Sequence, residues 1–251
     1  MKYTFTGKEK LINYIKSDGT SHSVALRQIM NVDSGRIGGW IESENNLDQA
    51  GHCWITENVE VFGNARIQDD VRIEGWVTVQ DNALVRNAVE IKSIKGQHIT
   101  IADSAVISDH AVIHGRTCIH GNAQIYENAL ISGNAIIRDS AKVYGQAKIY
   151  EDTIIAGKSH IFGNAVVKGH ARIGGYSLIF GDAVIQDRAR ISGNQIIIDG
   201  NALIGSDTVF KGTAVITGNS KFLCRETFSD GTYDGVQHID EEYDYDERDM
   251  L

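Results

Sequence analysis

Histidine is the residue type in this chain best suited to general acid–base chemistry, because its ordinary pKa of about 6.5 lies near neutral pH. Nine histidines are spread along the 251 residues. His98 lies close to Lys92 and Lys95, whose ammonium groups would attract phosphate groups. His160 lies two residues before Phe162. If the protein is an enzyme, we predict His98 or His160 as the base, and Lys92 and Lys95 as the residues that bind an anion.

Sequence motifs for other kinds of catalysis or for metal binding are missing. The sequence contains no glycine-rich phosphate loop, no Gly-x-Ser-x-Gly nucleophile motif and no HExxH zinc motif. Its three cysteines, Cys53, Cys118 and Cys224, are odd in number and far apart, which is typical of reduced thiols in a cytosolic protein. We therefore predict no metal site and a cytoplasmic location.

A six-residue repeat determines where these side chains must lie. Hexapeptides run from Ile55 (ITENVE, VFGNAR, IQDDVR), lose register at Ile91, and resume from Ile101 to Lys221 with one extra residue, Ile197. Position one is Ile or Val in 25 of 26 units, and position five is Ala, Val, Ser or Thr in 25. The break in register is where we expect a loop to leave the repeat, and this loop carries His98.

Each column of the repeat has a physical reason. Positions five, six, one and two alternate between inward apolar and outward polar residues, the period of a short strand with one buried face. Position three is Gly or Asp in 21 units and position four is often Asn, residue types that accept the positive φ of a tight bend. The chain contains no proline, which cannot donate to a strand ladder. The pattern predicts an all-β chain that coils as strand and corner.

Aromatic residues on the outside give the number of sides. Tyr126, Tyr144, Phe162 and Phe180 all occupy position two and are 18 residues apart. Eighteen residues are three hexapeptides, so three strands per turn would stack the four rings in one column. The sequence therefore predicts a three-sided parallel β-helix (solenoid) of about nine coils. Because large exposed apolar patches usually mark interaction sites, we predict that this column is a self-association interface; a ladder that only stabilises neighbouring coils is the alternative.

The pattern [Ile/Val]-x-[Gly/Asp]-x-[Ala/Ser/Thr]-x over residues 55–221 resembles the signature of the hexapeptide-repeat left-handed β-helix superfamily. The resemblance implies left-handed coils and a homotrimer. For the many acyltransferases of that superfamily it also implies a histidine base near the subunit interface and an acyl-CoA or acyl-carrier thioester as donor, whose phosphates Lys92 and Lys95 would attract. The segment GGWIESENNLDQAGHCWI (Gly38–Ile55) is further similar to the YdcK-like branch, whose members are usually labelled transferases.

Other features depart from the acetyltransferases of this fold. Those enzymes commonly carry a longer loop, proline-containing coils and a closing Gly-x-Pro-Ala segment with basic residues for CoA. This chain has a short insertion, no proline and an acidic C-terminus. We therefore expect a rigid binding or scaffold protein, such as a prophage accessory factor, with an acyltransferase as the first alternative. An acidic decoy that occupies a nucleic-acid-binding protein is the second alternative.

The repeat divides the chain into three parts. We predict an N-terminal cap (residues 1–54) with a hairpin around Asp18-Gly19, the β-helix (residues 55–221), and a C-terminal cap with an acidic tail (residues 222–251). The last part carries ten Asp or Glu and two Arg, so residues 1–221 contribute only −1 to the net charge of −9. A nearly neutral body argues against a nucleic-acid partner, whereas the tail is a candidate docking segment for a protein. No apolar run approaches the ~18 residues that would predict a membrane span.

Overall fold

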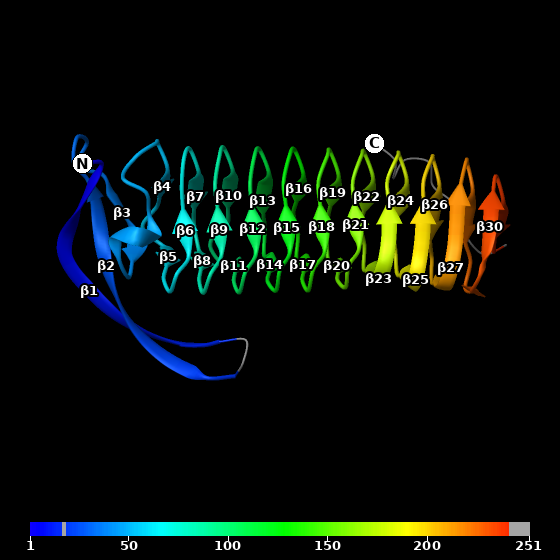
Figure 1. Ribbon diagram of the computed structural model, residues 1–251, viewed down its shortest axis with the longest axis horizontal. Helices are drawn as coiled ribbons and strands as arrows, with labels where there is room; N and C mark the ends of the chain where they lie inside the picture. The colour runs from blue at the N-terminus through cyan, green and yellow to red at the C-terminus, as the bar shows by residue number, and fades with distance from the viewer. Residues whose placement is uncertain (17–18, 241–251) are drawn as a thin grey trace.

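The computed structural model describes residues 1–16 and 19–240 and shows an all-β solenoid of parallel strands (Figure 1). The chain coils through three parallel β-sheets, here called PB1, PB2 and PB3, and every third strand joins the same sheet. In Figure 1 the strands nearest the viewer point upwards while the chain advances from left to right, which is the sense of a left-handed coil. The predicted three-sided, left-handed parallel β-helix is confirmed.

The number of coils follows from the number of strands in PB2, because each coil contributes one strand to this sheet. It contains 11 strands, so the solenoid has about eleven turns rather than the nine predicted. These strands are β4 (Trp54–Ile55), β7 (Arg72–Glu74), β10 (Glu90–Lys92), β13 (Val112–His114), β16 (Leu130–Ile131), β19 (Lys148–Ile149), β22 (Val166–Val167), β24 (Val184–Ile185), β26 (Leu203–Gly205), β28 (Lys221–Leu223) and β31 (Gln237–Ile239).

The two other sheets share their last long strands. PB1 contains β6 (Arg66–Ile67), β9 (Leu84–Val85), β12 (Val106–Ile107), β15 (Gln124–Ile125), β18 (Lys142–Val143), β21 (His160–Ile161) and β30 (Gly231–Asp234). PB3 contains β3 (Ile37–Ile41), β5 (Val59–Val61), β8 (Val77–Val79), β11 (Ile99–Ile101), β14 (Cys118–Ile119), β17 (Ile136–Ile137), β20 (Ile154–Ile155) and β29 (Thr227–Phe228). Three strands run through the corner from PB3 into PB1: β23 (Arg172–Ile179), β25 (Arg190–Ile198) and β27 (Val209–Thr217).

The extra coils lie at the ends, where the core residues depart from the hexapeptide. At the N-terminal end, Ile41 pairs with Val61 and Leu47 pairs with Ile67, so residues before Ile55 already follow the coil. At the other end the positions that elsewhere hold Ile or Val are all aromatic: Phe222, Phe228, Tyr233 and His238. These four rings pack on one another and close the core. The hexapeptide pattern does not extend to either coil, because Leu47 stands where Ile or Val is usual at the N-terminal end and rings occupy those positions at the other end.

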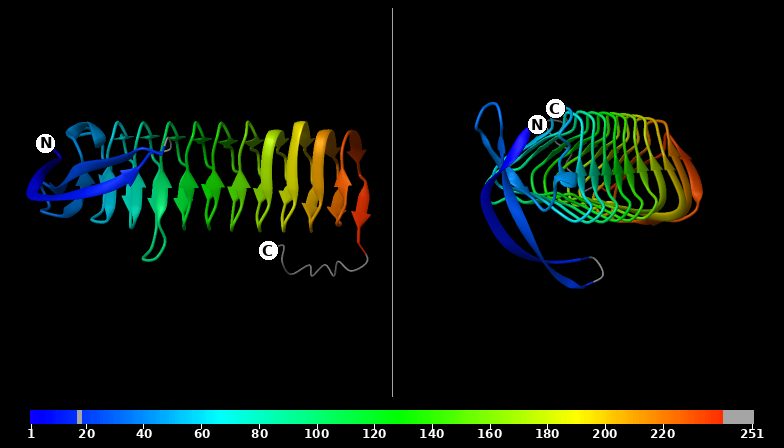
Figure 2. Two further views of the ribbon diagram at one scale, coloured as in Figure 1. Left: turned by 90° about the horizontal axis from the view of Figure 1, so that it is seen from below. Right: turned by 60° about the vertical axis from the view of Figure 1, so that its left-hand side comes forward.

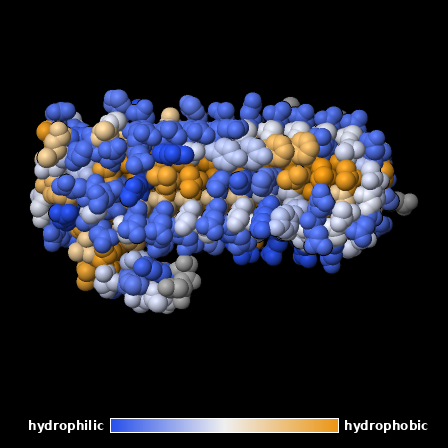
Figure 3. Space-filling model, viewed as in Figure 1, coloured by the Kyte–Doolittle hydropathy of each residue, from blue (hydrophilic) through white to orange (hydrophobic). Residues whose placement is uncertain are grey.

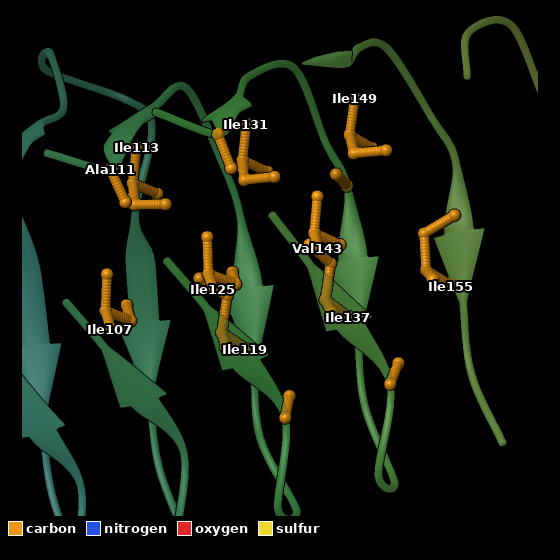
Figure 4. Packing of buried hydrophobic residues seen from close by; sticks show 14 of the residues in the cluster. Ile107, Ala111, Ile113, Ile119, Ile125, Ile131, Ile137, Val143, Ile149 and Ile155 are labelled. Atoms are coloured by element: carbon orange, nitrogen blue, oxygen red, sulfur yellow. The ribbon is translucent and has the colours of Figure 1, made fainter. Parts of the chain in front are cut away.

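The interior is a column of stacked branched side chains on each sheet. Ile113, Ile131 and Ile149 lie one above the other on PB2, each fully buried, with the same arrangement on the other two sheets (Figure 4). Burial of a β-branched side chain contributes on the order of 2 kcal/mol. Because every coil adds one such residue to each of the three columns, the hydrophobic core extends the whole length of the rod.

The corners explain the Gly and Asp of position three. Asp139 has φ 61° and its Oδ2 accepts the backbone N–H of Gly157, one coil further on, at 2.9 Å. Gly121 has φ +71°, and a Cβ there would lie 2.8 Å from the backbone N of Asp139. A carboxylate at one corner therefore caps the next corner, and the tight stacking leaves some corners room only for glycine.

A hairpin crosses the N-terminal end of the rod (Figure 2). Its strands β1 (Tyr3–Ile15) and β2 (Ser21–Asn31) pair antiparallel, so the predicted hairpin around Asp18-Gly19 is confirmed. Its inner side packs on Phe62, and Lys10 pairs with Glu60 of PB3 at 2.7 Å. The one helix among the described residues is the short 3-10 segment η1 (Glu44–Asn46). No helix in that part of the chain is long and apolar enough to cross a membrane.

The predicted acidic tail falls almost wholly on residues 241–251, which lie outside the described residues. The proposals that it docks a protein partner, or that the protein is an acidic decoy, therefore stay predictions. The same holds for the three predicted parts of the chain.

Candidate functional site

The predicted column of aromatic rings lies on the outer surface of PB1. Tyr126, Tyr144, Phe162 and Phe180 stack with ring centroids 4.7–4.9 Å apart and interplanar angles of 1–9°. We call these four residues the aromatic ladder. Each ring is half-buried: Tyr144 and Phe162 are stacked on both faces, and Tyr126 and Phe180, at the two ends, on one face. Within the ladder, Tyr144 and Phe162 thus present their ring edges rather than their ring faces.

An apolar row continues beside the ladder toward the C-terminal end of PB1. Leu178, Ile197 and Val215 stand in register on β23, β25 and β27, each half-buried and pointing outward. In Figure 3, which shows this side of the molecule, hydrophobic residues gather over these strands. Together with Phe162 and Phe180 this row makes a continuous apolar surface on the outside of the solenoid.

His160 lies at the edge of this apolar surface. On PB1 it stands between Lys142, one coil earlier, and Leu178, one coil later. Its imidazole meets the Tyr144 ring edge-on, with centroids 6.2 Å apart and an interplanar angle of 75°. Burial, and secondly the positive charge of Lys142, lowers the pKa of His160 below its usual 6.5. The imidazole is therefore neutral at pH 7 and suited to accept a proton.

His160 has no acidic partner in the part of the chain that the structure describes: no carboxylate oxygen there lies within 4.0 Å of its ring nitrogens. A base of this kind needs its substrate to supply the orienting contact, or a residue from another subunit. The residues around it, Lys142, Tyr144 and Leu178, are all 16 or 18 residues away. The 18-residue spacing that identified the ladder would also have identified Lys142 and Leu178, but the sequence prediction did not use it for that.

His98 lies in a different place, at the excursion between PB2 and PB3. It is exposed, and its Nε2 is 3.0 Å from the hydroxyl of Thr78. It lines a groove of about 540 Å³ on PB3. The other residues that line the groove are Thr100, Arg116, Thr117, Cys118, Asn134, Ile136 and Asp152. Burial raises the pKa of the Cys118 thiol, so this cysteine is protonated at neutral pH.

The two lysines predicted to bind an anion do not line that groove. Lys92 points outward from PB2, with its Nζ 3.8 Å from Glu74 Oε2. Lys95 lies on the excursion and is exposed. The structure thus separates Lys92 and Lys95 from the cavity residues around His98, and neither lysine is near His160 on PB1. Their role as CoA-binding residues stays a prediction.

No group of three or more His, Cys, Asp or Glu residues stands close enough to hold a metal ion in the described ranges 1–16 and 19–240. Cys53, Cys118 and Cys224 lie far apart in the solenoid and are free thiols. The remaining histidine–carboxylate contacts, such as His52 with Asp70 at 2.8 Å, are single pairs on the surface.

Comparison with known proteins gives one partial similarity. No family model matches the chain. The chain is similar to the "Uncharacterized acetyltransferase YdcK" of Escherichia coli (strain K12), with 39% identity over 71 residues. This match covers 26% of the chain and 22% of that protein, so the chain spans about a fifth of its relative's length. The match and the β-solenoid fold both fit the hexapeptide-repeat superfamily.

Proposed function

We propose that the protein is an acyltransferase of the hexapeptide-repeat superfamily, in its YdcK-like branch, which uses an acyl-CoA-type thioester as donor. The observation that carries the proposal is the setting of His160: a half-buried imidazole, with its pKa lowered, at the edge of an apolar surface on the outside of PB1. The similarity to a protein labelled an acetyltransferase supports the same reaction class. The free thiols and the donor suit a cytoplasmic protein.

His160 is the general base of the proposed reaction. The neutral imidazole takes the proton of an acceptor amine or hydroxyl, whose lone pair attacks the thioester carbonyl. The C–S bond then breaks, and the leaving thiolate takes the proton from the imidazolium. The products are the acylated acceptor and the free thiol, and the imidazole returns to its neutral form.

In a homo-oligomer, the apolar surface of PB1 from a second copy would close the site around His160. One subunit alone leaves His160 beside a flat, half-buried surface, whereas acyl transfer needs a site that excludes water. Association of PB1 with another copy on a closed symmetry axis covers the apolar row and encloses the imidazole. We propose a homotrimer; the number three comes from the resemblance to the superfamily.

Release of free thiol from acetyl-CoA, measured with a panel of amine and hydroxyl acceptors, tests the proposal. We expect turnover by the natural chain and loss of at least about 100-fold in His160→Ala, with an unchanged melting temperature. His98→Ala is the matched control and should retain turnover. Loss of turnover in His98→Ala, with turnover retained in His160→Ala, would place the reaction at the groove on PB3. Absence of turnover in the natural chain and in both variants would refute the enzyme proposal.

A second candidate, a rigid binding scaffold such as a prophage accessory factor, is favoured by one observation. The aromatic ladder repeats at every coil along four coils with no change of geometry, which suits an extended contact better than a single reacting centre. A scaffold would keep its oligomer and show no thiol release with any acceptor. The same assay therefore separates the two functions.

A further inference from the structure

The hairpin at the N-terminal end carries a strand edge that no described strand covers. Its outer part, here called the arm, consists of Glu9–Ile15 of β1 and Ser21–Arg27 of β2 (Figure 1). Within the described residues, β1 pairs with β2 and with no other strand. A strand in the middle of the rod, such as β15, is paired on both edges. The arm therefore presents a free edge of the kind that pairs readily with another strand.

The hydrogen-bonding groups of this edge belong to alternate residues of β1. Lys16 donates its backbone N–H to the carbonyl of Thr20, across the turn, at 2.9 Å. Bonded positions alternate along an antiparallel pair. Leu11, Asn13 and Ile15 therefore direct their N–H and C=O groups away from β2. An extended strand is the partner that satisfies such a row of groups.

The same residues give the arm an apolar outer face. Leu11 is 70% exposed and Ile15 is 69% exposed, the highest values among large hydrophobic residues of the described chain after the N-terminal methionine. The inner face of the arm is occupied, because Ile12 and Tyr14 pack toward Phe62. The partner that pairs with the free edge must therefore also cover apolar side chains on the outer face.

The sequence of this edge is complementary to itself. Residues 11–15 read Leu-Ile-Asn-Tyr-Ile, with two apolar residues on each side of Asn13. When a second β1 pairs antiparallel about a two-fold axis at Asn13, Leu11 of each copy lies opposite Ile15 of the other. On the inner face, Ile12 lies opposite Tyr14 in the same way. A shift of the register by two residues would place Asn13 opposite Leu11 or Ile15 instead.

The charges at the ends of this pairing are already balanced within each chain. The register places Lys10 opposite Lys16 of the other copy, and like charges at such positions repel. However, Lys10 Nζ lies 2.7 Å from Glu60 Oε1. Lys16 lines a pocket together with Asp81 and Asp103. Neither lysine therefore brings an uncompensated charge to the contact.

We propose that the arm binds the arm of a second copy, edge to edge and antiparallel, in an isologous contact centred on Asn13. The three pairs formed by Leu11, Asn13 and Ile15 each exchange two N–H···O=C bonds. The contact buries less than about 1,000 Å² in total, a size typical of transient association. It therefore adds no stable species in dilute protein. It is separate from the surface of PB1 and does not rest on the proposed function.

A disulfide at the two-fold axis tests the contact. Residues opposite each other in a bonded pair have Cα atoms about 5.5 Å apart, a distance that a disulfide spans. We expect Asn13→Cys to form a covalent dimer under mild oxidation, with position 13 linked to position 13 in the mapped peptides. The natural chain, which has three thiols of its own, gives the background on a non-reducing gel.

Ser23→Cys is the matched control for this cross-link. Ser23 lies opposite Asn13 on β2 and is equally exposed. In the proposed contact it is separated from Ser23 of the other copy by three strand spacings, about 14 Å. We therefore expect no covalent dimer from Ser23→Cys above the background of the natural chain.

Charges on the outer face give a second test, made in the Asn13→Cys chain. Leu11→Lys combined with Ile15→Lys should lower the yield of covalent dimer at least about tenfold, because four cations would meet on one face. The melting temperature should not change, since both side chains are exposed. Phe162→Lys combined with Phe180→Lys should still cross-link, so failure of the PB1 interface and failure of the arm contact are told apart.

Four results would overturn the inference. These are no covalent dimer from Asn13→Cys above the background, an equal yield from Ser23→Cys, an unchanged yield in the chain with lysine at positions 11 and 15, and a cross-link that joins position 13 to a native cysteine.

Discussion

PB1 and PB3 are built on the same repeat, yet between β20 and β27 their outer surfaces are opposite in character. Inside, both sheets present fully buried isoleucines. Outside, PB1 carries rings that stack on one another with centroids under 5 Å apart, whereas PB3 carries Arg172 and Arg190 side by side with no described carboxylate to pair with. The rings of the ladder find their partners in one another, whereas Arg172 and Arg190 have no ion-pair partner among the described residues. Positions one and five therefore specify the solenoid, while positions two and six are free to carry function.

The largest expected effect is a loss of stability, which should differ between two adjacent residues, one inside the core and one on the outer surface. Ile137 is fully buried in the core and Ile136 beside it is half-buried on the outer surface of PB3. Ile137→Asp buries a carboxylate without a partner and should cost several kcal/mol, about 4 or more, so that the protein unfolds or aggregates.

Ile136→Asp is the matched control and should cost less than about 1 kcal/mol, because its carboxylate stays in water. Thermal melts of both variants make the measurement. Similar melting temperatures for the two variants would contradict the inside and outside assignment, and with it the register of the whole repeat.

The next prediction compares the loss of stability on replacing two glycines, only one of which lies at a corner where a side chain does not fit. Gly121 has φ +71°, with a Cβ position 2.8 Å from the backbone of Asp139, whereas a Cβ at Gly174 is unobstructed. Gly121→Ala should destabilise by about 1–3 kcal/mol. Gly174→Ala should lie within about 0.5 kcal/mol of the natural chain. A denaturant titration in which Gly174→Ala is the less stable variant would contradict the close contact between the corners at Gly121 and Asp139.

The fold could be predicted well from the sequence because the same residue types recur at the same positions of every hexapeptide. Ile or Val at position one and Gly or Asp at position three recur often enough to give strand, corner and number of sides, and the 18-residue spacing gave the ladder. The C-terminal coil was missed because Phe222, Phe228, Tyr233 and His238 fill its core with rings in place of Ile or Val. At the candidate site His160 was predicted but its neighbours were not, because Lys142 and Leu178 lie beside it only through the register between coils.

The grouping of lysines with His98 shows the opposite limit. Lys92 and Lys95 are near His98 along the chain, but neither lines the groove beside His98, and Lys92 lies beside Glu74. The arginines that do form a cluster, Arg172 and Arg190, are 18 residues apart and carry no local motif. In a solenoid, residues one coil apart are closer neighbours than residues that follow each other around a corner.

A smaller effect concerns pH and His160. Its pKa is lowered in the folded protein, chiefly by burial, so between that value and about 6.5 the unfolded chain binds more protons than the folded one. Folding stability should therefore rise with pH through this window and stay level above it. His160→Gln should lose less melting temperature between pH 7.5 and pH 5 than the natural chain does. An equal loss in both would mean that His160 has an ordinary pKa.

Acyl-transfer activity should follow the same titration. The base acts only when neutral, so the rate should fall as the pH drops through the lowered pKa of His160. Lys142→Met removes the second cause of the shift, and it should move the acidic limb of the pH–rate profile to higher pH. A profile that moves to lower pH, or does not move, would show that Lys142 does not act on the reacting group.

Solution mass, measured by sedimentation velocity, tests most directly whether the outer surface of PB1 works by association. We predict that the natural chain sediments as a trimer of its 27.5 kDa subunit. Phe162→Lys combined with Phe180→Lys should sediment as a smaller species with an unchanged β-sheet circular dichroism signal, because the charges disrupt the interface and leave the core intact. A natural chain that stays a monomer at high micromolar concentration would show that PB1 is not an interface, and the ladder would then serve only to stack neighbouring coils.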